Sequence, residues 1–372
     1  MPELTLRNVF KRYADVGTKK KTAEVDFAVN DLSLVCREGE FVGILGPSGC
    51  GKSTTLRMIA GLEEITAGDI LIGDTRINDL EPKDRHIGLA FEDYALYPPL
   101  NVYENIAFNL RAKKMDKDTI DKKVKAIAPL LKVDDILHER PINLSGGQKQ
   151  RVNIARAIVR EPRLLLLDEP LSHLDGKMRQ ILRAEIKRMH RDIKCTTIIV
   201  THDQLEAMSL ADRIAIMKDG KLLQFGTPLE IYDNPVNDFV AGFIGEPPMN
   251  LMAVTIKQTG SDFLFVFSGG KISIPVPPRY YKVVHDGMKL RLGVRPTDVK
   301  VGSPTGLGSD VSVSVFESLG EERRVHFRVG EEFLTLITTE KIRCRPGDVL
   351  KLEVLAEKTH LFDLKTGERI RS

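Results

Sequence analysis

Two patterns of apolar residues divide the chain. Over roughly the first 245 residues, short apolar runs alternate with segments whose apolar residues recur at helical spacing. Phe41–Leu45, Leu164–Leu167 and Thr197–Val200 are predicted to be buried strands because each is a short apolar run bounded by polar or turn residues. Strands that alternate with helices are typical of a parallel α/β sheet.

Two apolar stripes at helical spacing predict helices that pack on the core. One stripe consists of Leu182, Ile186, Met189 and Ile193. The other consists of Val124, Ile127, Leu130 and Leu131. The second stripe belongs to a stretch, from about residue 93 to residue 159, whose pattern is mostly helical. We therefore expect a helical subdomain within an α/β domain that spans residues 1–245.

After the turn Gly245–Pro248 the apolar residues alternate with polar ones. Val311, Val313 and Val315 form one such set. Val325, Phe327 and Val329 form another. Glycine and proline turns separate the runs, which predicts a small all-β barrel or sandwich over residues 246–372.

Length and composition agree with two ordinary globular domains. The chain has 372 residues, 42% of them hydrophobic and 29% charged. The net charge of +3 is nearly balanced and argues against a nucleic-acid partner, which needs a concentrated basic surface. The one tight basic cluster near the start, Lys19–Lys21, is interpreted as a solvated loop.

No apolar stretch approaches the length needed to cross a bilayer, and the N-terminus does not resemble a signal peptide. The four cysteines form no CxxC pair, so we interpret them as reduced thiols. We therefore expect any membrane role to depend on a partner chain.

A glycine-rich segment follows the first predicted strand. It consists of Gly46, Pro47, Ser48, Gly49, Cys50, Gly51, Lys52 and Ser53, and it matches GxxxxGK followed by Ser or Thr. A helix is predicted to begin near Thr54. Backbone N–H groups in such a loop surround phosphates, Lys52 reaches the β- and γ-phosphates, and the Ser53 hydroxyl suits Mg²⁺. The segment predicts ATP as a ligand.

An acidic pair follows the second predicted strand. Asp168 stands at the strand's carboxyl end, where it is suited to hold Mg²⁺ through water, and Glu169 is suited to act as a general base on an attacking water. Such a pair by itself is weak evidence, since helix N-caps look similar. Together with the phosphate-binding loop it indicates ATP hydrolysis.

A third motif comes directly before a predicted helix and is the one that is most specific to a family. It consists of Leu144, Ser145, Gly146, Gly147 and Gln148. The chain here resembles ABC-type ATPases, whose signature motif is LSGGQ. The resemblance implies that the signature of one subunit contacts the nucleotide of another, in a head-to-tail dimer.

Further residues match this family one by one. Tyr13 matches an aromatic residue that stacks on adenine, and His202 matches a histidine that contacts the γ-phosphate. The stretch Ser172–Asp175, which includes His173, matches a loop along the dimer interface, and the resemblance therefore implies that His173 and Asp175 lie there. The resemblance covers nearly the whole chain.

Two segments narrow the resemblance to importers. Tyr94–Pro98 and Asn101–Ile106 are similar to the segment that receives a membrane subunit, although such a loop is also compatible with internal packing. Gly293–Pro296 and Phe362–Gly367 are similar to the regulatory β-domain, with an OB-like fold, of maltose-type carbohydrate importers. The resemblance implies import of a carbohydrate, polyol or related solute, with polyamines and metal chelates as alternatives.

The resemblance also implies partners and a location. These are two transmembrane permease subunits, an extracytoplasmic solute-binding protein acting through the complex, and a second ATPase subunit that is either the same chain or a different one. The chain would lie at the cytoplasmic face of the membrane as a peripheral subunit. A soluble ABC ATPase of translation or DNA repair is disfavoured by the single phosphate-binding loop and the lack of sustained heptads. A regulator that binds other proteins through the β-domain is compatible with transport.

Two positions depart from the family pattern. Glu92 stands after Phe91, where a Gln is usual, and His173 replaces a smaller residue. An ionised Glu92 keeps the ability to ligate Mg²⁺, but it adds negative charge near the γ-phosphate and loses a donor. We therefore expect an altered metal dependence of hydrolysis.

Overall fold

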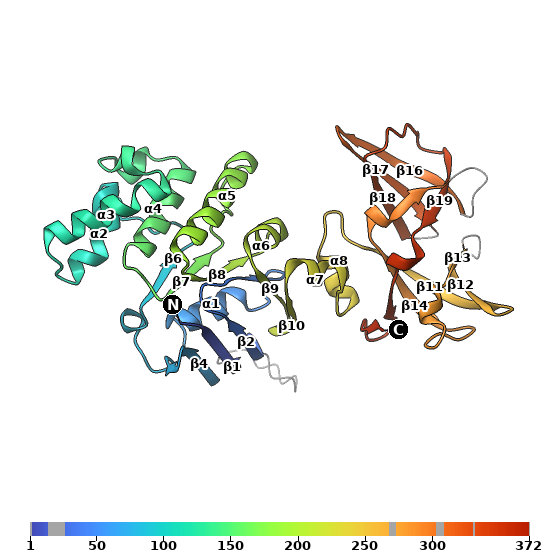
Figure 1. The fold of residues 1–372 in the computed structure, drawn as a ribbon, viewed down its shortest axis with the longest axis horizontal. Coiled ribbons are helices and arrows are strands. Elements are labelled where there is room, and N and C mark those ends of the chain that lie inside the picture. The colour runs from blue at the N-terminus through green and yellow to red at the C-terminus, as the bar shows by residue number, and fades with distance from the viewer. Residues whose placement is uncertain (1, 14–26, 268–272, 303–308, 330–331, 372) are drawn as a thin grey trace, which may run out of the picture. The chain divides into compact units, whose positions relative to one another are not determined.

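The computed structural model describes residues 2–13, 27–267, 273–302, 309–329 and 332–371. The basic cluster Lys19–Lys21 lies outside the described residues. The chain forms two compact units, Met1–Pro228 and Leu229–Ser372, which are described separately (Figure 1). The division lies upstream of the Gly245–Pro248 turn, because two short helices before this turn belong to the second unit.

The first unit is built on a six-stranded sheet with the order β10-β9-β3-β8-β7-β6. Its strands are β3 (Phe41–Leu45), β6 (Ile87–Ala90), β7 (Leu164–Asp168), β8 (Thr196–Thr201), β9 (Arg213–Lys218) and β10 (Lys221–Gly226). All neighbours pair in parallel except β10, which pairs antiparallel with β9 at one edge. The strands β3, β7 and β8 are buried along their whole length, as the apolar runs predict. The carboxyl ends of the parallel strands therefore meet at one edge of the sheet.

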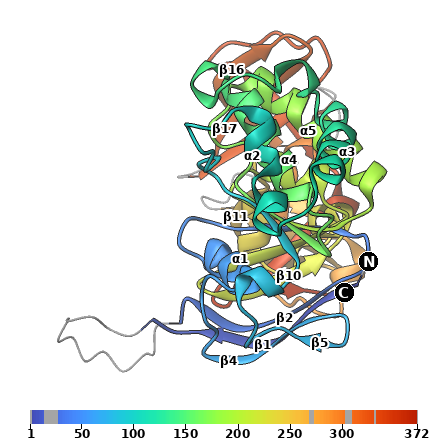
Figure 2. The same ribbon diagram turned by 90° about the vertical axis from the view of Figure 1, so that its left-hand side faces the viewer.

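A second, antiparallel sheet packs into the same core. Its strands, in the order β2-β1-β4-β5, are β1 (Leu4–Lys11), β2 (Val29–Cys36), β4 (Ala67–Ile72) and β5 (Thr75–Arg76). Apolar residues from β1, β2 and β4 share one buried cluster with residues of β3, β7 and β8. Figure 2 shows this sheet as a separate layer, with α1 (Lys52–Ala60) between it and the other helices.

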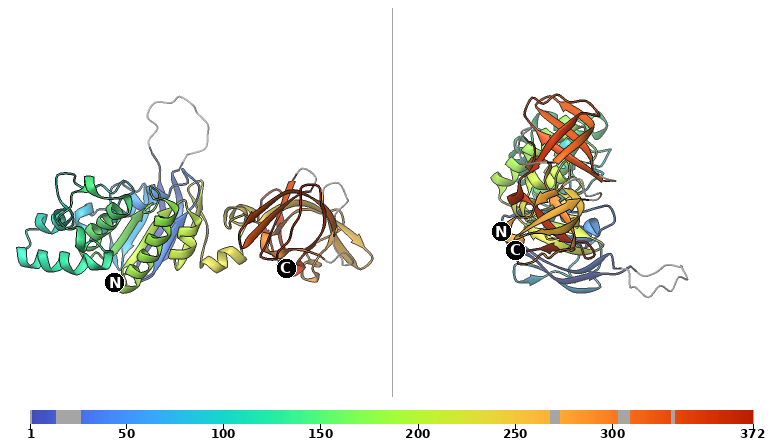
Figure 3. Two further views of the ribbon diagram at one scale, coloured as in Figure 1. Left: turned by 90° about the horizontal axis from the view of Figure 1, so that it is seen from above. Right: turned by 90° about the vertical axis from the view of Figure 1, so that its right-hand side faces the viewer.

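The remaining helices of the first unit begin with clear capping residues. They are α2 (Val102–Ala112), α3 (Lys117–Ile127), α4 (Gly146–Ile158), α5 (Gly176–Ile193) and α6 (Gln204–Leu210). The side chains that cap them are those of Asn101, Asp116, Ser145, Asp175 and Asp203, each of which accepts a backbone N–H from the first turn. Helices α2, α3 and α4 fall between residues 93 and 159 and gather at one end of the unit (Figures 1 and 3).

The second unit consists of two antiparallel sheets preceded by α7 (Pro228–Asp233) and α8 (Asp238–Phe243). One sheet has the order β13-β12-β11-β14-β20-β21, from β11 (Asn250–Thr259), β12 (Asp262–Phe267), β13 (Ser273–Pro275), β14 (Lys289–Val294), β20 (His360–Asp363) and β21 (Arg369–Ile370). The other has the order β15-β19-β16-β17-β18, from β15 (Val299–Val301), β16 (Ser309–Leu319), β17 (Glu322–Val329), β18 (Glu332–Thr338) and β19 (Val349–Val354). Their inward residues share one core, and Figure 3 shows the strands curving around it. An α/β unit followed by a β-rich unit confirms the predicted fold class.

The structure corrects two details of the apolar patterns. Leu130 is 44% exposed, whereas Val124 and Leu131 are buried. Helix α3 ends at Ile127 and Pro129 begins a 3₁₀ turn, which rotates Leu130 away from the stripe. Val315 is 46% exposed, whereas Val311 and Val313 are buried. The pairing of β16 with β17 shifts register between Val313 and Val315, and this bulge breaks the alternation.

Among the described residues, no helix is both long and apolar enough to cross a membrane. All four cysteines are buried free thiols, in agreement with the interpretation from the sequence.

Candidate functional site

The glycine-rich loop connects β3 to α1 and needs its glycines for both conformation and space. Gly49 and Gly51 have φ angles of 79° and 100°, in the left-handed region that residues with side chains avoid. A Cβ atom at Gly51 would lie 2.3 Å from the carbonyl oxygen of Ala28. The first turn of α1 therefore opens directly at the end of this loop, with its free N–H groups facing the loop.

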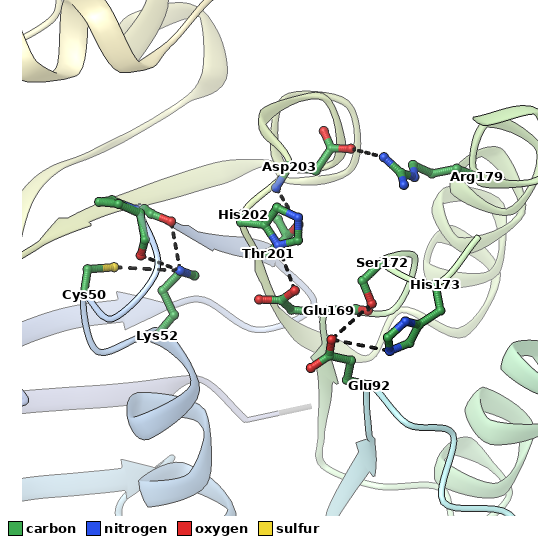
Figure 4. Close-up of polar contacts among 12 residues, drawn as sticks. Cys50, Lys52, Glu92, Glu169, Ser172, His173, Arg179, Thr201, His202 and Asp203 are labelled. Carbon is green, nitrogen blue, oxygen red and sulfur yellow. Dashed lines mark hydrogen bonds and ion pairs between the residues drawn. The ribbon is translucent and has the colours of Figure 1, made fainter. Parts of the chain in front are cut away.

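Lys52 is the first residue of α1, and its side chain turns back into the loop (Figure 4). Its ammonium group donates to the carbonyl oxygens of Gly46 and Pro47, both at 2.8 Å, and the side chain is buried. These bonds hold a buried positive charge where the predicted phosphates would lie.

Glu169 follows β7 directly and meets His202, which follows β8. Its backbone N–H donates to the carbonyl oxygen of Val200 at 2.9 Å, and its φ angle of 41° is left-handed. Glu169 Oε2 and His202 Nδ1 are 2.8 Å apart (Figure 4). A strained backbone that aims a carboxylate at a loop is characteristic of functional sites.

One cavity of about 480 Å³ brings much of the predicted site together. Its lining residues are Ala28, Ser48, Gly49, Gly51, Lys52, Ser53, Thr54, Glu169 and His202. The loops after three parallel strands thus converge on one space at the carboxyl edge of the sheet. Ala28 belongs to no predicted motif, and its position follows only from the packing of β2 beside the loop.

Asp168 is buried at the end of β7 and is crowded by like charge. Burial, together with Glu169 and Glu92, raises the pKa of the Asp168 carboxyl to about 6. Its Oδ1 atom is buried and accepts no hydrogen bond from any described residue. A buried carboxylate oxygen without a donor, beside other carboxylates, fits a hydrated divalent cation, and the Ser53 hydroxyl would be a further ligand for it.

Few protein ligands are available for such a cation. Within the described ranges, no three His, Cys, Asp or Glu residues form a group suited to hold a metal ion. Mg²⁺ usually takes one or two carboxylates and completes its coordination with water and substrate phosphates.

The two residues that depart from the family pattern contact each other. Glu92 Oε1 lies 3.5 Å from His173 Nε2 and 3.5 Å from the hydroxyl of Ser172, which donates to it (Figure 4). Asp93 Oδ1 is 3.8 Å from the same His173 nitrogen. The sequence identifies each departure separately, but only the fold brings them together, since they lie about 80 residues apart.

Hydrogen bonds attach the loop that contains Glu92 to α4. The side chain of Asn153 donates to the carbonyl oxygen of Phe91 at 2.8 Å, and Arg156 donates to the carbonyl oxygens of Tyr94 and Ala95. Tyr94 and Ala95 both have positive φ angles, so these bonds hold a strained segment. Arg156 was missed by sequence reasoning because nothing in its own neighbourhood indicates which carbonyl groups it reaches.

The signature residues form the amino end of α4. Ser145 and Gln148 form a capping box, in which each side chain accepts the other's backbone N–H. Gly147 packs against Met178, whose sulfur would lie 2.8 Å from a Cβ at that position. Gly146 lies near the Tyr94 hydroxyl and Leu174. None of the five residues of the signature motif lines the cavity formed by the phosphate-binding loop.

Tyr13 and Asp175 also lie outside the cavity lining. Tyr13 is half exposed, and the ammonium group of Lys11 lies 4.8 Å from the centre of its ring. The Asp175 carboxylate accepts the backbone N–H of Met178 and so caps α5.

Comparisons with known proteins agree with this geometry. Residues 29–172 match the family model described as ABC transporter, and residues 245–299 match the one described as MalK OB fold domain. The sn-glycerol-3-phosphate import ATP-binding protein UgpC of Escherichia coli (strain K12) is 44% identical over 342 residues, which are 92% of this chain and 95% of that protein. Its counterpart in Salmonella typhi is 43% identical over the same shares of both chains.

Solved structures give the same result for the first unit. The ATP-binding cassette MJ0796, solved as a dimer in a post-hydrolysis state bound to ADP and Pi, is 33% identical with a TM-score of 0.52, covering 60% of this chain and 98% of that one. CbiO1 from Clostridium perfringens is 28% identical with a TM-score of 0.55, covering 62% of this chain and 90% of that one. The resemblance drawn from the sequence motifs is thereby confirmed. The chain belongs to the ABC transporter family, as a transport-coupled ATP-binding subunit that carries a MalK-type domain after its ATPase unit.

Proposed function

We propose that this chain hydrolyses ATP at the cavity of the phosphate-binding loop and powers the import of a carbohydrate, polyol or related solute. The main support for this proposal is that Lys52, Glu169 and His202 line one cavity. The substrate class rests on the MalK-type domain and on the 44% identity to a glycerol-phosphate importer subunit. A polyol phosphate is therefore the first solute to test.

The loop residues Gly46–Thr54 bind the nucleotide phosphates through backbone N–H groups and Lys52. Tyr13 stacks on the adenine from its half-exposed position. Residues Ser145–Gln148 lie outside the cavity lining, so they contact the nucleotide of a second ATPase subunit rather than their own. His173 and Asp175 lie along that interface.

Mg²⁺ is the metal that the carboxylates fit. Ser53, Asp168 and Glu92 would hold it, and the bound ion would neutralise charge on the phosphate oxygens. Burial and two neighbouring acids raise the pKa of Asp168 to about 6, and a cation bound at its unpartnered Oδ1 would favour the ionised form.

Glu169 acts as the general base on the attacking water. His202, 2.8 Å from its carboxylate, orients it and supplies a donor toward the γ-phosphate. The strained backbone at Glu169 fixes the carboxylate at the end of β7, so catalysis depends mainly on positioning and electrostatics.

Substitution of Glu169 by Gln tests the assignment of the base. We expect the variant to bind ATP as tightly as the parent while hydrolysis falls by at least about 100-fold. Nucleotide affinity and phosphate release are measured on the same preparation, with Glu321→Gln in the second unit as the matched control. Substantial residual hydrolysis would contradict the role of Glu169.

We infer the partner proteins from an exposed apolar surface beside the helical end of the first unit. A cavity of about 300 Å³ is lined in part by Leu62, Phe91 and Tyr97, all exposed, and by Arg156. An exposed apolar hollow of this kind suits an amphipathic helix from another protein. We assign it to the permease subunits, which places the chain at the cytoplasmic face of the membrane as a peripheral subunit. A solute-binding protein acts through the same complex.

The partners are tested by isolating the tagged chain from native membranes in mild detergent and identifying what comes with it by mass spectrometry. We expect two multispanning proteins, with or without a second ATPase chain. The co-purifying solute-binding protein is then titrated with polyol phosphates and sugars, and with polyamines and metal chelates as the alternatives. Recovery of ribosomes or DNA-repair proteins without membrane proteins would overturn the partner assignment and leave the ATP site standing.

A further inference from the structure

The second unit contains a cavity of its own that the ATPase cycle does not use. Its volume is about 730 Å³, and its walls come from α7, β20, β21, the segment that follows β14 and two further turns. It includes no residue of the nucleotide site.

Positive charge exceeds negative charge around this cavity. The cationic lining residues are Arg279, Arg295, Lys358, Arg369 and Arg371. The acidic ones are Asp233, Asp298 and Glu357, of which Glu357 is engaged by Arg279 at 3.2 Å. In the part of the chain that the structure describes, Lys358 and Arg371 have no carboxylate within ion-pair distance. Neither cation is held in an ion pair by a described residue, although the charge of Lys358 acts on the nearby carboxyl of Asp298.

The pKa of His360 shows the sign of the electrostatic potential at this cavity. Burial, followed by the charges of Arg369, Arg295, Arg279 and Lys358, lowers the pKa of its imidazole to about 4. Its Nδ1 atom is buried and has no hydrogen-bond partner among the described residues. The imidazole is therefore neutral at physiological pH and sits in a positive potential that the three acids do not cancel.

Arg295 provides a buried donor in the same wall. The residue is only 3% exposed, and its terminal nitrogens donate to the carbonyl oxygens of Tyr232, Ala241 and Ile244. Its Nε atom is buried and has no acceptor within the described ranges. Buried N–H groups are rarely left without a partner, so the described residues leave one donor of this guanidinium unsatisfied in the cavity wall.

We propose that this cavity binds a small, multiply charged oxyanion that carries a phosphate group. Guanidinium and ammonium groups are the protein's usual partners for phosphate, and the guanidinium fork matches its oxygens in pairs. The cavity falls within the size range of small-molecule sites, so it has room for a phosphate ester as well as for free phosphate. The site goes beyond ATP hydrolysis and gives the second unit a ligand of its own.

The test titrates the full-length chain by calorimetry while its nucleotide site is occupied. The Glu169→Gln chain is saturated with ATP and Mg²⁺, so added phosphate does not compete for the phosphate-binding loop. The probes are inorganic phosphate, glucose 6-phosphate and, as the uncharged control, glucose. We expect saturable binding of the phosphate-bearing probes and none of glucose, with affinity falling as ionic strength rises.

Paired substitutions locate the binding. Lys358→Gln with Arg371→Gln removes the two cations that lack carboxylate partners, and we expect binding to weaken by about tenfold or more. Lys289→Gln, an exposed position of the same unit outside the cavity, should leave binding unchanged. Tighter binding of glucose 6-phosphate than of phosphate would identify an ester as the ligand, and the reverse would identify free phosphate. No binding of either, or undiminished binding in the double variant, overturns the proposal without affecting the nucleotide site.

Discussion

At the scale of single residues, the ATP site concentrates negative charge. Asp168 and Glu169 are adjacent in sequence, and the fold adds Glu92 from another loop. The raised pKa of Asp168 follows from burial and from these two neighbours. Glu92 stands where the family pattern has a neutral Gln, so this subunit carries one more negative charge beside the site than the pattern does.

Replacing Glu92 with Gln should therefore change the metal dependence. We expect the Mg²⁺ concentration for half-maximal hydrolysis to shift and the rate to rise by about two- to tenfold, because a like charge is removed and an N–H donor is restored. Hydrolysis is measured across a Mg²⁺ titration, with Asp93→Asn, at the exposed neighbouring carboxylate, as the control. An unchanged rate together with an unchanged Mg²⁺ midpoint would show that Glu92 has no such effect.

The buried carboxyl group of Glu206 should make the stability of the first unit depend on pH. Its side chain is 2% exposed, and burial, aided by Asp203, raises its pKa from 4.5 to about 7. The folded state thus binds this proton more tightly than the unfolded state, so the cost of the buried carboxylate is absent below about pH 4.5 and grows until about pH 7. Glu206→Gln should stabilise the first unit by about 1–3 kcal/mol at pH 8 and hardly at all at pH 4.5.

The measurement is urea unfolding at the two pH values, followed through the transition that added ATP shifts to higher urea. Glu64→Gln, at an exposed position, provides the matched control. Equal stabilisation by Glu206→Gln at both pH values would contradict the raised pKa.

At the scale of secondary-structure elements, α2 organises the loop that precedes it. Asn105 is fully buried on this helix, and its side-chain oxygen accepts the backbone N–H of Tyr97 at 2.8 Å. Its amide nitrogen donates to the carbonyl oxygens of Tyr97, Leu100 and Asn101. One side chain therefore holds the loop that contributes Tyr97 to the exposed apolar hollow.

Asn105→Ala should release this loop without touching the nucleotide. We expect the first unit to lose about 1–3 kcal/mol, because several backbone groups lose buried partners. Recovery of permease subunits with the tagged chain should fall several-fold, while ATP affinity stays within about twofold of the parent. Arg111→Ala, at an exposed position of the same helix, serves as the control. Undiminished recovery of permease subunits would show that this loop is not part of the docking surface.

At the scale of the whole molecule, the phosphate-binding loop and the signature motif lie apart within one chain. The cavity contains no signature residue, although Ser48 and Ser145 are both exposed. A site that needs both motifs would therefore require a second subunit, which the proposed head-to-tail arrangement supplies.

Cross-linking between chains tests this arrangement directly. One Glu169→Gln chain carries Ser48→Cys and the other carries Ser145→Cys, and the four native cysteines are buried, which keeps the background low. We expect a short bismaleimide to cross-link the two variants when they are mixed with ATP and Mg²⁺. We expect no cross-link between two copies of the same variant. Cross-linking of one variant alone to the same extent, or no effect of ATP, would contradict the head-to-tail site.

The sequence by itself determined the strands β3, β7 and β8, the phosphate-binding loop, the acidic pair and the signature motif. These features depend on neighbours in the chain, because apolar runs, turn glycines and helix caps act over a few residues. Tertiary structure alone decided the contact of Glu92 with His173, the anchoring of the Glu92 loop by Arg156, and the bulge that exposes Val315. It also assembled the basic cavity of the second unit. Each of these joins residues that are distant along the chain, and no local pattern specifies which strand ends, carbonyl groups or cations will meet.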